Sequence, residues 1–506
     1  MNRRQFIKTS TAAALGANII GCSKHTEKPN LLFIWTDEQR ADTMKVYGNK
    51  NIHAPNLNKL ASESLVFRNA YVSQPVCTPS RSTVMTGLWP HNNGCTENNL
   101  PLSMEIPVLS EMVDDPEYRS AYMGKWHLGD EIFNQHGFDE WISIEDNYRK
   151  YYRKGRNRNQ LSDYGQFLQQ LGYEPDNNDG RYSRSFASGL PLEHCKPKFL
   201  ESRAIDFLQR NQNNPFMLYI NFLEPHPPFF GPMDNHHSLR EVQFPVNFDD
   251  PLEEDEPLWY RIRREILRQE GSKDLDLRVK SVWHNLIQKY WGLVTQVDLS
   301  VGAILGTLEN LGLADNTIVV FTSDHGDMMG SHRLLHKTVM YQESVQVPWL
   351  MRVPQMGRRQ NIVSDHVSHI DLVPTLLDFM NKGQNENLPG TSLRPVILEN
   401  EKDRDAFIEW NPQLHRYKPE KKSYLPGVSV KETNMVKHAY RRAVITQEGF
   451  KLVLADQDGN QLYDLNKDPF ETTNLVHESQ YRDLILRHTK KITDWQQRTN
   501  DDCKIV

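Results

Sequence analysis

Three short, mostly apolar runs constrain the fold of this chain more than any other feature of its sequence. They are Leu31–Trp35, Phe216–Phe222 and Ile318–Phe321. Runs of this length without regular apolar–polar alternation are typical of strands that are covered on both faces, as in parallel sheets. The sequence therefore predicts an α/β fold built on a buried parallel sheet.

Polar residues closely follow each of these runs. Asp37 and Glu38 come after the first run, His226 after the second, and Asp324 and His325 after the third. In open α/β sheets, ligands bind at the carboxyl ends of the parallel strands. We therefore expect the three loops to converge at one edge of the sheet and to form a site there.

The C-terminal part of the chain shows a different pattern. Its apolar runs are separated by Glu448-Gly449 and Asp458-Gly459, which are hairpin turn signals. We expect a main domain over residues 29–395 and a smaller unit over residues 400–506. The smaller unit is predicted to be an antiparallel sheet that ends in a helix at Tyr481–Gln496.

Composition argues against two functional classes. The 506 residues carry a net charge of −6, whereas nucleic-acid-binding proteins are usually basic, so we expect no nucleic-acid partner. The five cysteines contain no Cys-x-x-Cys pair, which argues against a zinc knuckle or a disulfide framework.

Residues 1–22 resemble an export signal. Arg3 and Arg4 are similar to a twin-arginine motif, and the apolar run Thr11–Ile20 is too short to span a bilayer. The residues before Cys22 resemble the end of a bacterial lipoprotein signal, which implies a protein lipid-anchored at Cys22 in the periplasm or at the cell surface. The alternative is a simple cleaved signal with an incidental cysteine. No later segment is expected to cross a membrane.

Two charged runs interrupt the main domain. Tyr148–Arg158 is basic with interleaved tyrosines, and Asp249–Pro257 is acidic. Charged runs are usually solvated faces, and we expect that for both. The functional alternative for Tyr148–Arg158 is a groove wall that binds a polyanion.

Cys77 lies in an unusual setting, in the stretch PVCTPSRSTVMTG. A free cysteine is most often a small buried hydrophobe, but the neighbouring serines and threonines are poor company for a core residue. A second interpretation is a thiolate nucleophile whose pKa is lowered by Arg81 and whose base is His127 or His226.

A third interpretation comes from the stretch CTPSR, which fits the Cys-x-Pro-x-Arg motif of the formylglycine-dependent sulfatases, a family of the alkaline phosphatase superfamily. The stretches TDEQR, GKWHLG, EPHPPF, SDHGD and HKTVMYQESVQVP resemble further motifs of that family, in family order, between Asn30 and Leu475. The resemblance implies a large mixed, mostly parallel sheet flanked by helices, with a smaller C-terminal antiparallel sheet plus helix.

The resemblance also implies the chemistry. A maturation enzyme would convert Cys77 to Cα-formylglycine, whose hydrate has two hydroxyls on one carbon. One hydroxyl attacks the sulfur of a sulfate ester, and loss of the proton from the other expels sulfate. A serine lacks the second hydroxyl and would be trapped as the sulfated enzyme.

The catalytic roles that the resemblance implies rest on motif positions. Arg81 would orient the nucleophile, and Lys125 and Lys337 would bind the sulfate oxygens as they gain charge. His127 would take the proton from the second hydroxyl, and His226 would protonate the departing alcohol, together with Lys337.

A divalent cation is implied beside the nucleophile. Its expected ligands are Asp37, Glu38, Cys77 in its modified form, Asp324 and His325, and Gln39 is the alternative to Glu38. Carboxylate oxygens suit calcium, which is the first expectation. His325 stands where the commoner family pattern has an asparagine, and an imidazole ligand makes manganese the alternative.

The expected substrate is a sulfated polysaccharide or oligosaccharide, either algal, such as ulvan, or a glycosaminoglycan. Small aryl or alkyl sulfates are an alternative. Arg333, His336 and His415 are further candidates for binding sugar sulfates or uronates. One rival function is a formylglycine-dependent phosphonate monoester hydrolase or phosphodiesterase of the same superfamily. The other is a surface lipoprotein that binds sulfated glycans without cleaving them.

Overall fold

The computed structural model describes residues 28–399, 404–415 and 418–505. The export signal expected at residues 1–22, with Cys22, lies outside the described residues.

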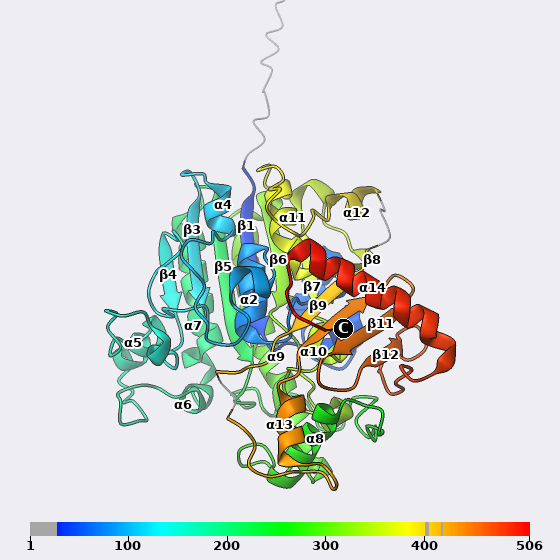
Figure 1. Cartoon of the computed structure of the whole chain (residues 1–506). Helices are drawn as coiled ribbons and strands as arrows, with labels where there is room; N and C mark the ends of the chain where they lie inside the picture. Colours follow the sequence, from blue (N-terminus) through cyan, green and yellow to red (C-terminus); the bar gives the residue numbers. More distant parts are fainter. Residues whose placement is uncertain (1–27, 400–403, 416–417, 506) are drawn as a thin grey trace, which may run out of the picture.

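An eight-stranded sheet runs through the centre of the molecule (Figure 1). Its strand order is β4-β3-β5-β1-β6-β7-β2-β8. Neighbouring strands are parallel except where β7 pairs with β6 and with β2, so the sheet is mixed and mostly parallel, as expected. The strands are β1 (Asn30–Asp37), β2 (Leu65–Tyr71), β3 (Arg119–Gly124), β4 (Glu140–Ser143), β5 (Phe216–Pro225), β6 (Thr317–Ser323), β7 (Trp349–Arg352) and β8 (Asn361–Ser368).

Helices cover both faces of this sheet. The alternation along β1 shows it, because Leu32 and Ile34 pack in one apolar cluster and Leu31, Phe33 and Trp35 in another. The helices that supply the first cluster are α1 (Pro55–Ser62), α7 (Lys196–Arg210) and α9 (Lys280–Asn310). The second cluster includes residues of α2 (Cys77–Thr86), α4 (Leu109–Val113), α11 (Leu372–Phe379) and α12 (Arg394–Glu399).

The helix α9 corrects one expectation from the sequence. By length and hydropathy it is apolar enough to cross a membrane, although no segment after the signal was expected to be. Two-thirds of its most apolar window, 67%, is buried inside the protein, where α9 packs against α7, α1 and β5. Its apolar character therefore fits a core helix that is covered by protein on most sides.

A smaller antiparallel sheet forms the C-terminal part, on the right in Figure 1. It contains β9 (Ala406–Trp410), β10 (Arg441–Ile445), β11 (Phe450–Ala455) and β12 (Gln461–Asp464), and the long helix α14 (Arg482–Thr499) follows. The two expected hairpins join β10 to β11 and β11 to β12. This matches the predicted sheet plus helix, whereas the limits 29–395 and 400–506 for the two units stay predictions.

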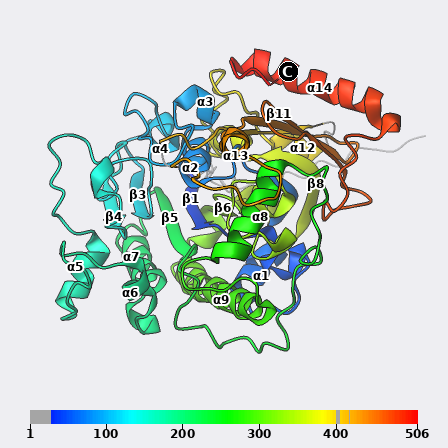
Figure 2. The same ribbon diagram turned by 60° about the horizontal axis from the view of Figure 1, so that its bottom comes forward.

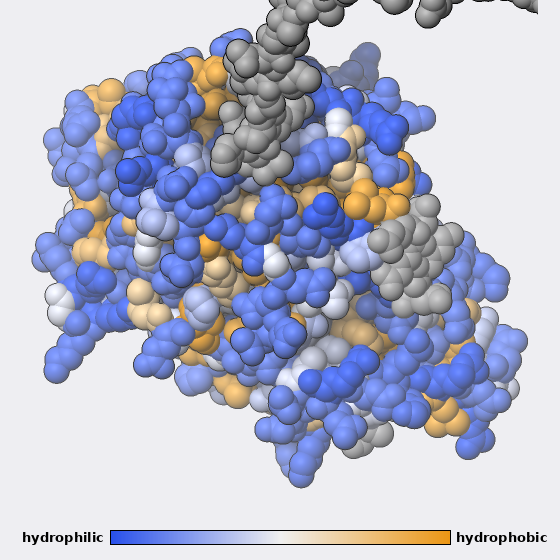
Figure 3. All heavy atoms as spheres, turned by 90° about the horizontal axis from the view of Figure 1, so that it is seen from above, coloured by the Kyte–Doolittle hydropathy of each residue, from blue (hydrophilic) through white to orange (hydrophobic). Residues whose placement is uncertain are grey.

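The remaining helices lie outside these layers, and several of them surround the edge of the large sheet where its central strands end. Figure 2 brings this edge forward, with α6 on one side and α8 on the other. The opposite face, from which the described chain begins, is mostly hydrophilic with scattered apolar patches (Figure 3). The helices are α3 (Pro90–Asn93), α5 (Asp163–Gln170), α6 (Arg184–Ser188), α8 (Leu258–Glu270), α10 (Gln342–Val345) and α13 (Val430–Lys437).

Gly124 shows how closely the backbone is packed at the end of β3. Its φ of +118° lies in the region that favours glycine, and a Cβ there would come 1.9 Å from the carbonyl oxygen of Asn221. Gly312 also has a positive φ, +71°, but no atom lies within 4 Å of a Cβ built there.

We predict that Gly124→Ala destabilises the protein more than Gly312→Ala. Both variants carry the cost of a positive φ, about 1–2 kcal/mol, and only Gly124→Ala adds a clash with backbone, about 1–3 kcal/mol more. Thermal unfolding of the two variants beside the wild type measures the difference. Equal losses in the two variants would contradict the close packing described here.

Candidate active site

The loops that follow β1, β5 and β6 meet at one edge of the large sheet, as the sequence predicts. These strands are neighbours in the order β5-β1-β6 and all run in the same direction. Asp37 ends β1, His226 follows β5, and Asp324 and His325 follow β6. All four lie with Cys77 at this edge, and Asp37, Asp324 and His325 are completely buried.

Arg81 holds the centre of the site together. It lies one helical turn after Cys77 in α2, and its guanidinium is completely buried. Nε donates to Oδ2 of Asp324 at 2.9 Å, and another nitrogen donates to Oδ2 of Asp37 at 3.1 Å. The third nitrogen donates to the backbone carbonyl of Lys125 at 2.8 Å. These bonds supply a buried charge with the partners that it needs.

Lys125 adds a second cation to Asp37. Its ammonium donates to the same Oδ2 oxygen that Arg81 binds. Burial acts to raise the pKa of Asp37, but Lys125 and Arg81 outweigh burial and hold this pKa well below its ordinary value. Asp37 is therefore a carboxylate at physiological pH.

The second oxygens of Asp37 and Asp324 face Cys77 and His325, and these four side chains together could bind a cation. Oδ1 of Asp37 lies 3.9 Å from Sγ of Cys77, and Oδ1 of Asp324 lies 3.5 Å from Nε2 of His325. The ligand atoms of Asp37, Cys77, Asp324 and His325 all lie within 4.8 Å of one another. Nδ1 of His325 is hydrogen-bonded to the carbonyl of Gly326 at 2.9 Å, and this contact turns Nε2 toward Sγ of Cys77 at 3.3 Å, within the candidate cation group.

Glu38 lies beside this group rather than within it. Its carboxylate accepts from Nζ of Lys337 at 2.7 Å and lies 3.3 Å from His336 and 3.6 Å from His226. It forms a neighbouring candidate group with Asp37 and His226. The assignment of Glu38 as a ligand of the same cation stays a prediction.

Gln39, the alternative ligand, is also buried, and its side-chain nitrogen donates to Oγ1 of Thr43 at 2.8 Å. Its side-chain oxygen has no hydrogen-bond partner among the described residues, so this alternative stays a prediction as well.

His127 is held by three contacts. Its backbone N–H donates to the buried carboxyl of Glu131 at 2.6 Å, and its ring stacks on Tyr148 with centroids 4.2 Å apart. Nε2 lies 2.9 Å from the side-chain oxygen of Asn99, and Nδ1 has no hydrogen-bond partner in the described part of the chain. Burial, together with the charge of Lys125, holds the pKa of His127 well below its usual range. The ring is therefore neutral at physiological pH, and Nδ1 is available as a base.

The charges around Cys77 favour its ionised form. Burial acts to raise the pKa of the thiol, but Lys337 and Lys125 outweigh burial and hold this pKa below its ordinary value. This is consistent with a reactive position and argues against the interpretation of Cys77 as a plain core residue.

A pocket of about 1100 Å³ opens over these residues. Its wall includes Cys77, His127, His226, His336 and Lys337, together with Arg184 at the start of α6 and several residues of the α8–α9 connection.

The basic stretch at 148–158 contributes only in part. Tyr148, Lys150 and Tyr151 line the pocket, as the groove-wall interpretation expects, whereas Arg153 and Arg156 pair with Asp130 elsewhere.

Two further candidate residues lie away from the pocket. Arg333 pairs with Asp249, and His415 is 79% exposed beside Glu97. Neither belongs to the pocket wall that the described residues form, whereas His336 does.

Some residues of the site carry no motif that sequence reasoning found. Asn99 and Glu131 hold His127, and the side-chain oxygen of Asn221 accepts from Arg81 at 3.0 Å. Arg184 reaches the pocket from the segment between β4 and α7. The one available signal was polarity in an apolar strand, at Asn221.

Comparisons with known proteins agree with this geometry. The sulfatase family model matches residues 29–382, and a model described as N-sulphoglucosamine sulphohydrolase, C-terminal, matches residues 330–498. An N-acetylglucosamine-6-O-sulfatase of Bacteroides thetaiotaomicron is 26% identical, with 94% of this chain and 88% of the relative covered. An ulvan-active sulfatase of Formosa agariphila is 27% identical, with 90% and 79% covered.

Solved structures share the fold. A phosphonate monoester hydrolase of Agrobacterium radiobacter superposes with a TM-score of 0.73 at 23% identity and covers 93% of this chain and 96% of its own. Because the family model spans well over half of the residues, the chain belongs to the sulfatase family, a family of sulfuric ester hydrolases.

Proposed function

We propose that this protein hydrolyses sulfate esters of sulfated carbohydrates with a formylglycine nucleophile made from Cys77. The observation that carries the proposal is the position of Cys77. It lies at the start of a buried helix, next to a cation-binding group, at the base of a pocket whose wall also holds His127, His226 and Lys337. A nucleophile, a base, an acid and fixed positive charge are the parts that sulfate ester hydrolysis needs.

The chain's own residues prepare this chemistry. When formed, formylglycine supplies one hydroxyl for attack on sulfur and a second whose deprotonation releases sulfate. Lys337 lines the pocket, and Lys125 is buried on Asp37, where its charge also acts on Cys77. Both neutralise the charge that develops on the sulfate oxygens, and their fixed positions avoid the cost of reorganisation during the reaction. Nδ1 of His127 accepts the proton of the second hydroxyl, and Asn99 keeps the ring in the required tautomer.

His226 stands on the side of the leaving alcohol. Its Nε2 lies 3.6 Å from the carboxylate of Glu38, to which Lys337 is also bound. Burial holds the pKa of His226 well below its usual range, so the ring is neutral before substrate binds and Lys337 carries the proton. Glu38 keeps the two groups beside the same position in the pocket. We propose that His226 and Lys337 together deliver this proton to the alcohol oxygen as its bond to sulfur breaks.

The cation would be held by Asp37, Asp324, His325 and the modified Cys77, with Glu38 as a fifth ligand. Calcium is our first assignment because oxygen donors predominate, and manganese is the alternative because of the imidazole. When bound, the cation supplies positive charge that favours ionisation of the nucleophile's hydroxyl.

The substrate class rests on relatives and on the pocket. Relatives named for N-acetylglucosamine 6-O-sulfate and for ulvan align over most of this chain. The pocket is large enough for a sugar and is walled by aromatic and basic residues. We further propose that the protein is exported and anchored to a membrane surface through Cys22, which would place it where polymers arrive from outside.

Free sulfate release tests the function. We predict that protein matured with formylglycine releases sulfate from a panel of sulfated saccharides or from p-nitrophenyl sulfate, and that Cys77→Ala loses at least about 10⁴-fold in rate because the covalent route is gone. Faster turnover of bis-p-nitrophenyl phosphate would favour the phosphodiesterase alternative. Saccharide binding by matured protein without any sulfate release would favour the glycan-binding alternative.

The role of His226 predicts a dependence on the leaving group. His226→Ala should slow sulfate release from a sugar by about 10²–10⁴-fold, because an alkoxide leaves poorly without a proton. The loss with p-nitrophenyl sulfate should be much smaller, since nitrophenolate leaves unaided. His415→Ala, an exposed histidine outside the pocket, serves as the control. An equal loss of rate with both substrates would show that His226 does not take part in protonating the leaving alcohol.

The cation group predicts a change in metal content. His325→Ala should weaken binding of the divalent cation by at least about 10-fold. A loss of this size is typical even when the mutated residue only hydrogen-bonds to a metal ligand. Elemental analysis after dialysis measures this without reference to activity. Asp276→Ala is the control, because the carboxylate of Asp276 is 44% exposed and lies outside the pocket. His325→Asn should restore calcium in preference to manganese, and unchanged metal content in His325→Ala would refute the assignment.

A further inference from the structure

We propose that the pocket selects sugars that carry a second anionic group on the same ring as the reacting sulfate, and that Arg184 binds this second group. The inference rests on the proposed function and narrows its substrate class. The second anion is a carboxylate or another sulfate, since the oxygens of both accept a charge-assisted hydrogen bond from a guanidinium nitrogen.

The position of Arg184 places it on the sugar side of the site. It is the first residue of α6 and lines the pocket. One of its guanidinium nitrogens lies 3.4 Å from Nδ1 of His226, the residue that we place beside the leaving oxygen. An anion bound to Arg184 therefore lies within about one sugar ring of the bond that breaks.

The guanidinium is fixed in place before substrate arrives. It donates from Nε to the buried carboxylate of Glu145 at 2.7 Å and from another nitrogen to the hydroxyl of Tyr148 at 2.8 Å. Tyr148 in turn stacks on His127. Arg184 and the proposed base therefore share a rigid support, and little side-chain entropy is lost when an anion binds.

The charge around Arg184 is not balanced. Glu145 binds Lys196 as well as Arg184, so one carboxylate serves two cations. Glu224 is also nearby, but burial raises its pKa to about 7, so it offsets only part of the excess. Tyr148 contributes no charge at neutral pH, because burial raises its pKa. A net positive charge therefore remains at the pocket wall.

The other charged residues of the pocket wall are also mostly positive. Its wall contains the basic residues Lys150, Arg184, Arg263, Lys273, Lys289 and Lys337 and, among the residues that the structure describes, a single acid, Asp274. The whole chain has a net charge of −6. Basic side chains thus outnumber acidic ones in the pocket wall. Like Arg184, Lys337 and Lys289 pair with acids outside the wall, Glu38 and Asp234.

Matched substrate pairs test the inference. One pair is N-acetylglucosamine 6-sulfate and N-sulfoglucosamine 6-sulfate, and the other is a 2-O-sulfated hexuronate and its carboxyl methyl ester. We predict that the wild type prefers the doubly charged member of at least one pair by about 10–100-fold in kcat/KM, the discrimination expected of one charge-assisted contact. The pair that shows the preference identifies the second anion as sulfate or carboxylate.

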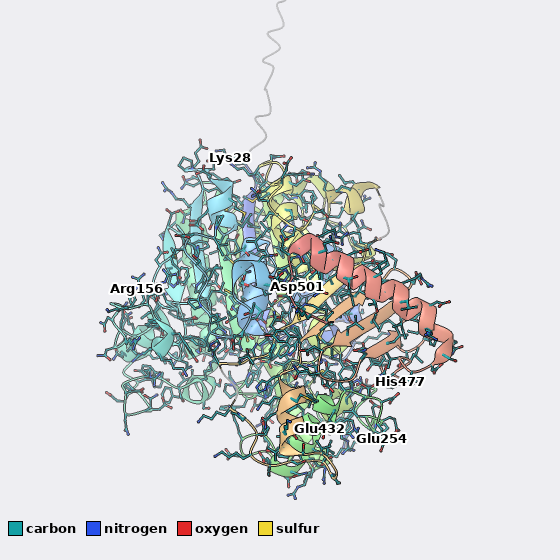
Figure 4. The ribbon with its side chains drawn as sticks, viewed as in Figure 1. Lys28, Arg156, Glu254, Glu432, His477 and Asp501 are labelled. Carbon is teal, nitrogen blue, oxygen red and sulfur yellow. The ribbon has the colours of Figure 1, made fainter. Side chains whose placement is uncertain are left out.

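Variants of Arg184 assign the preference to this residue. Arg184→Gln should bring the ratio of the two kcat/KM values close to one, and Arg184→Lys should keep part of it. A general loss of folding lowers both values and leaves the ratio unchanged, so the ratio separates binding from stability. Arg156→Gln is the control, because Arg156 pairs with Asp130 at the outer edge of the same segment and should keep the wild-type ratio (Figure 4).

Three results are decisive against the inference. A wild type without preference in either pair overturns it while leaving the sulfatase function intact. So does an Arg184→Gln variant that keeps the preference. Absence of sulfate release from every saccharide and from p-nitrophenyl sulfate overturns the proposed function, and the inference with it.

Discussion

The buried ion pairs of Arg81 with Asp37 and Asp324 are the interaction on which the rest of the site depends. Each carboxylate gives one oxygen to the guanidinium and turns the other toward Cys77 and His325. Removal of Arg81 would leave Asp324 without its arginine partner and Asp37 with Lys125 alone, and breaking buried ion pairs is far more costly than loss of a surface ion pair. One arginine in α2 thus fixes two strand ends and the nucleophile's helix in a single arrangement.

The large sheet supplies this constraint, and the segments around it supply selectivity. β1, β5 and β6 carry their polar ends to one edge because they are neighbouring parallel strands. The segment between β4 and α7 and the α8–α9 connection then both contribute to the wall of the pocket. Catalytic groups therefore stand on α2, at strand ends or in the loops that follow the strands, while the groups that contact a sugar come from longer connecting segments that vary more easily.

The sequence was enough to predict the sheet and much of the site, because both are local patterns. Apolar runs that end in Asp37, His226 and Asp324 predict converging loops, and the motif around Cys77 predicts its neighbours. Contacts between distant segments were not predictable. The position of Arg184 near His226, the contact of Asn99 with His127 and the turn of Glu38 toward Lys337 depend on tertiary packing that no motif records. The apolar helix α9 shows the converse, since burial in the core explains its hydropathy.

The mass of the peptide that contains Cys77 tests the central claim most directly. The peptide is to be isolated from catalytically active protein made in a host that has the maturation enzyme. We predict the loss of mass that accompanies replacement of the CH₂–SH side chain by an aldehyde, together with reaction of that peptide with a hydrazide. An unmodified thiol at Cys77 in fully active protein would contradict the account.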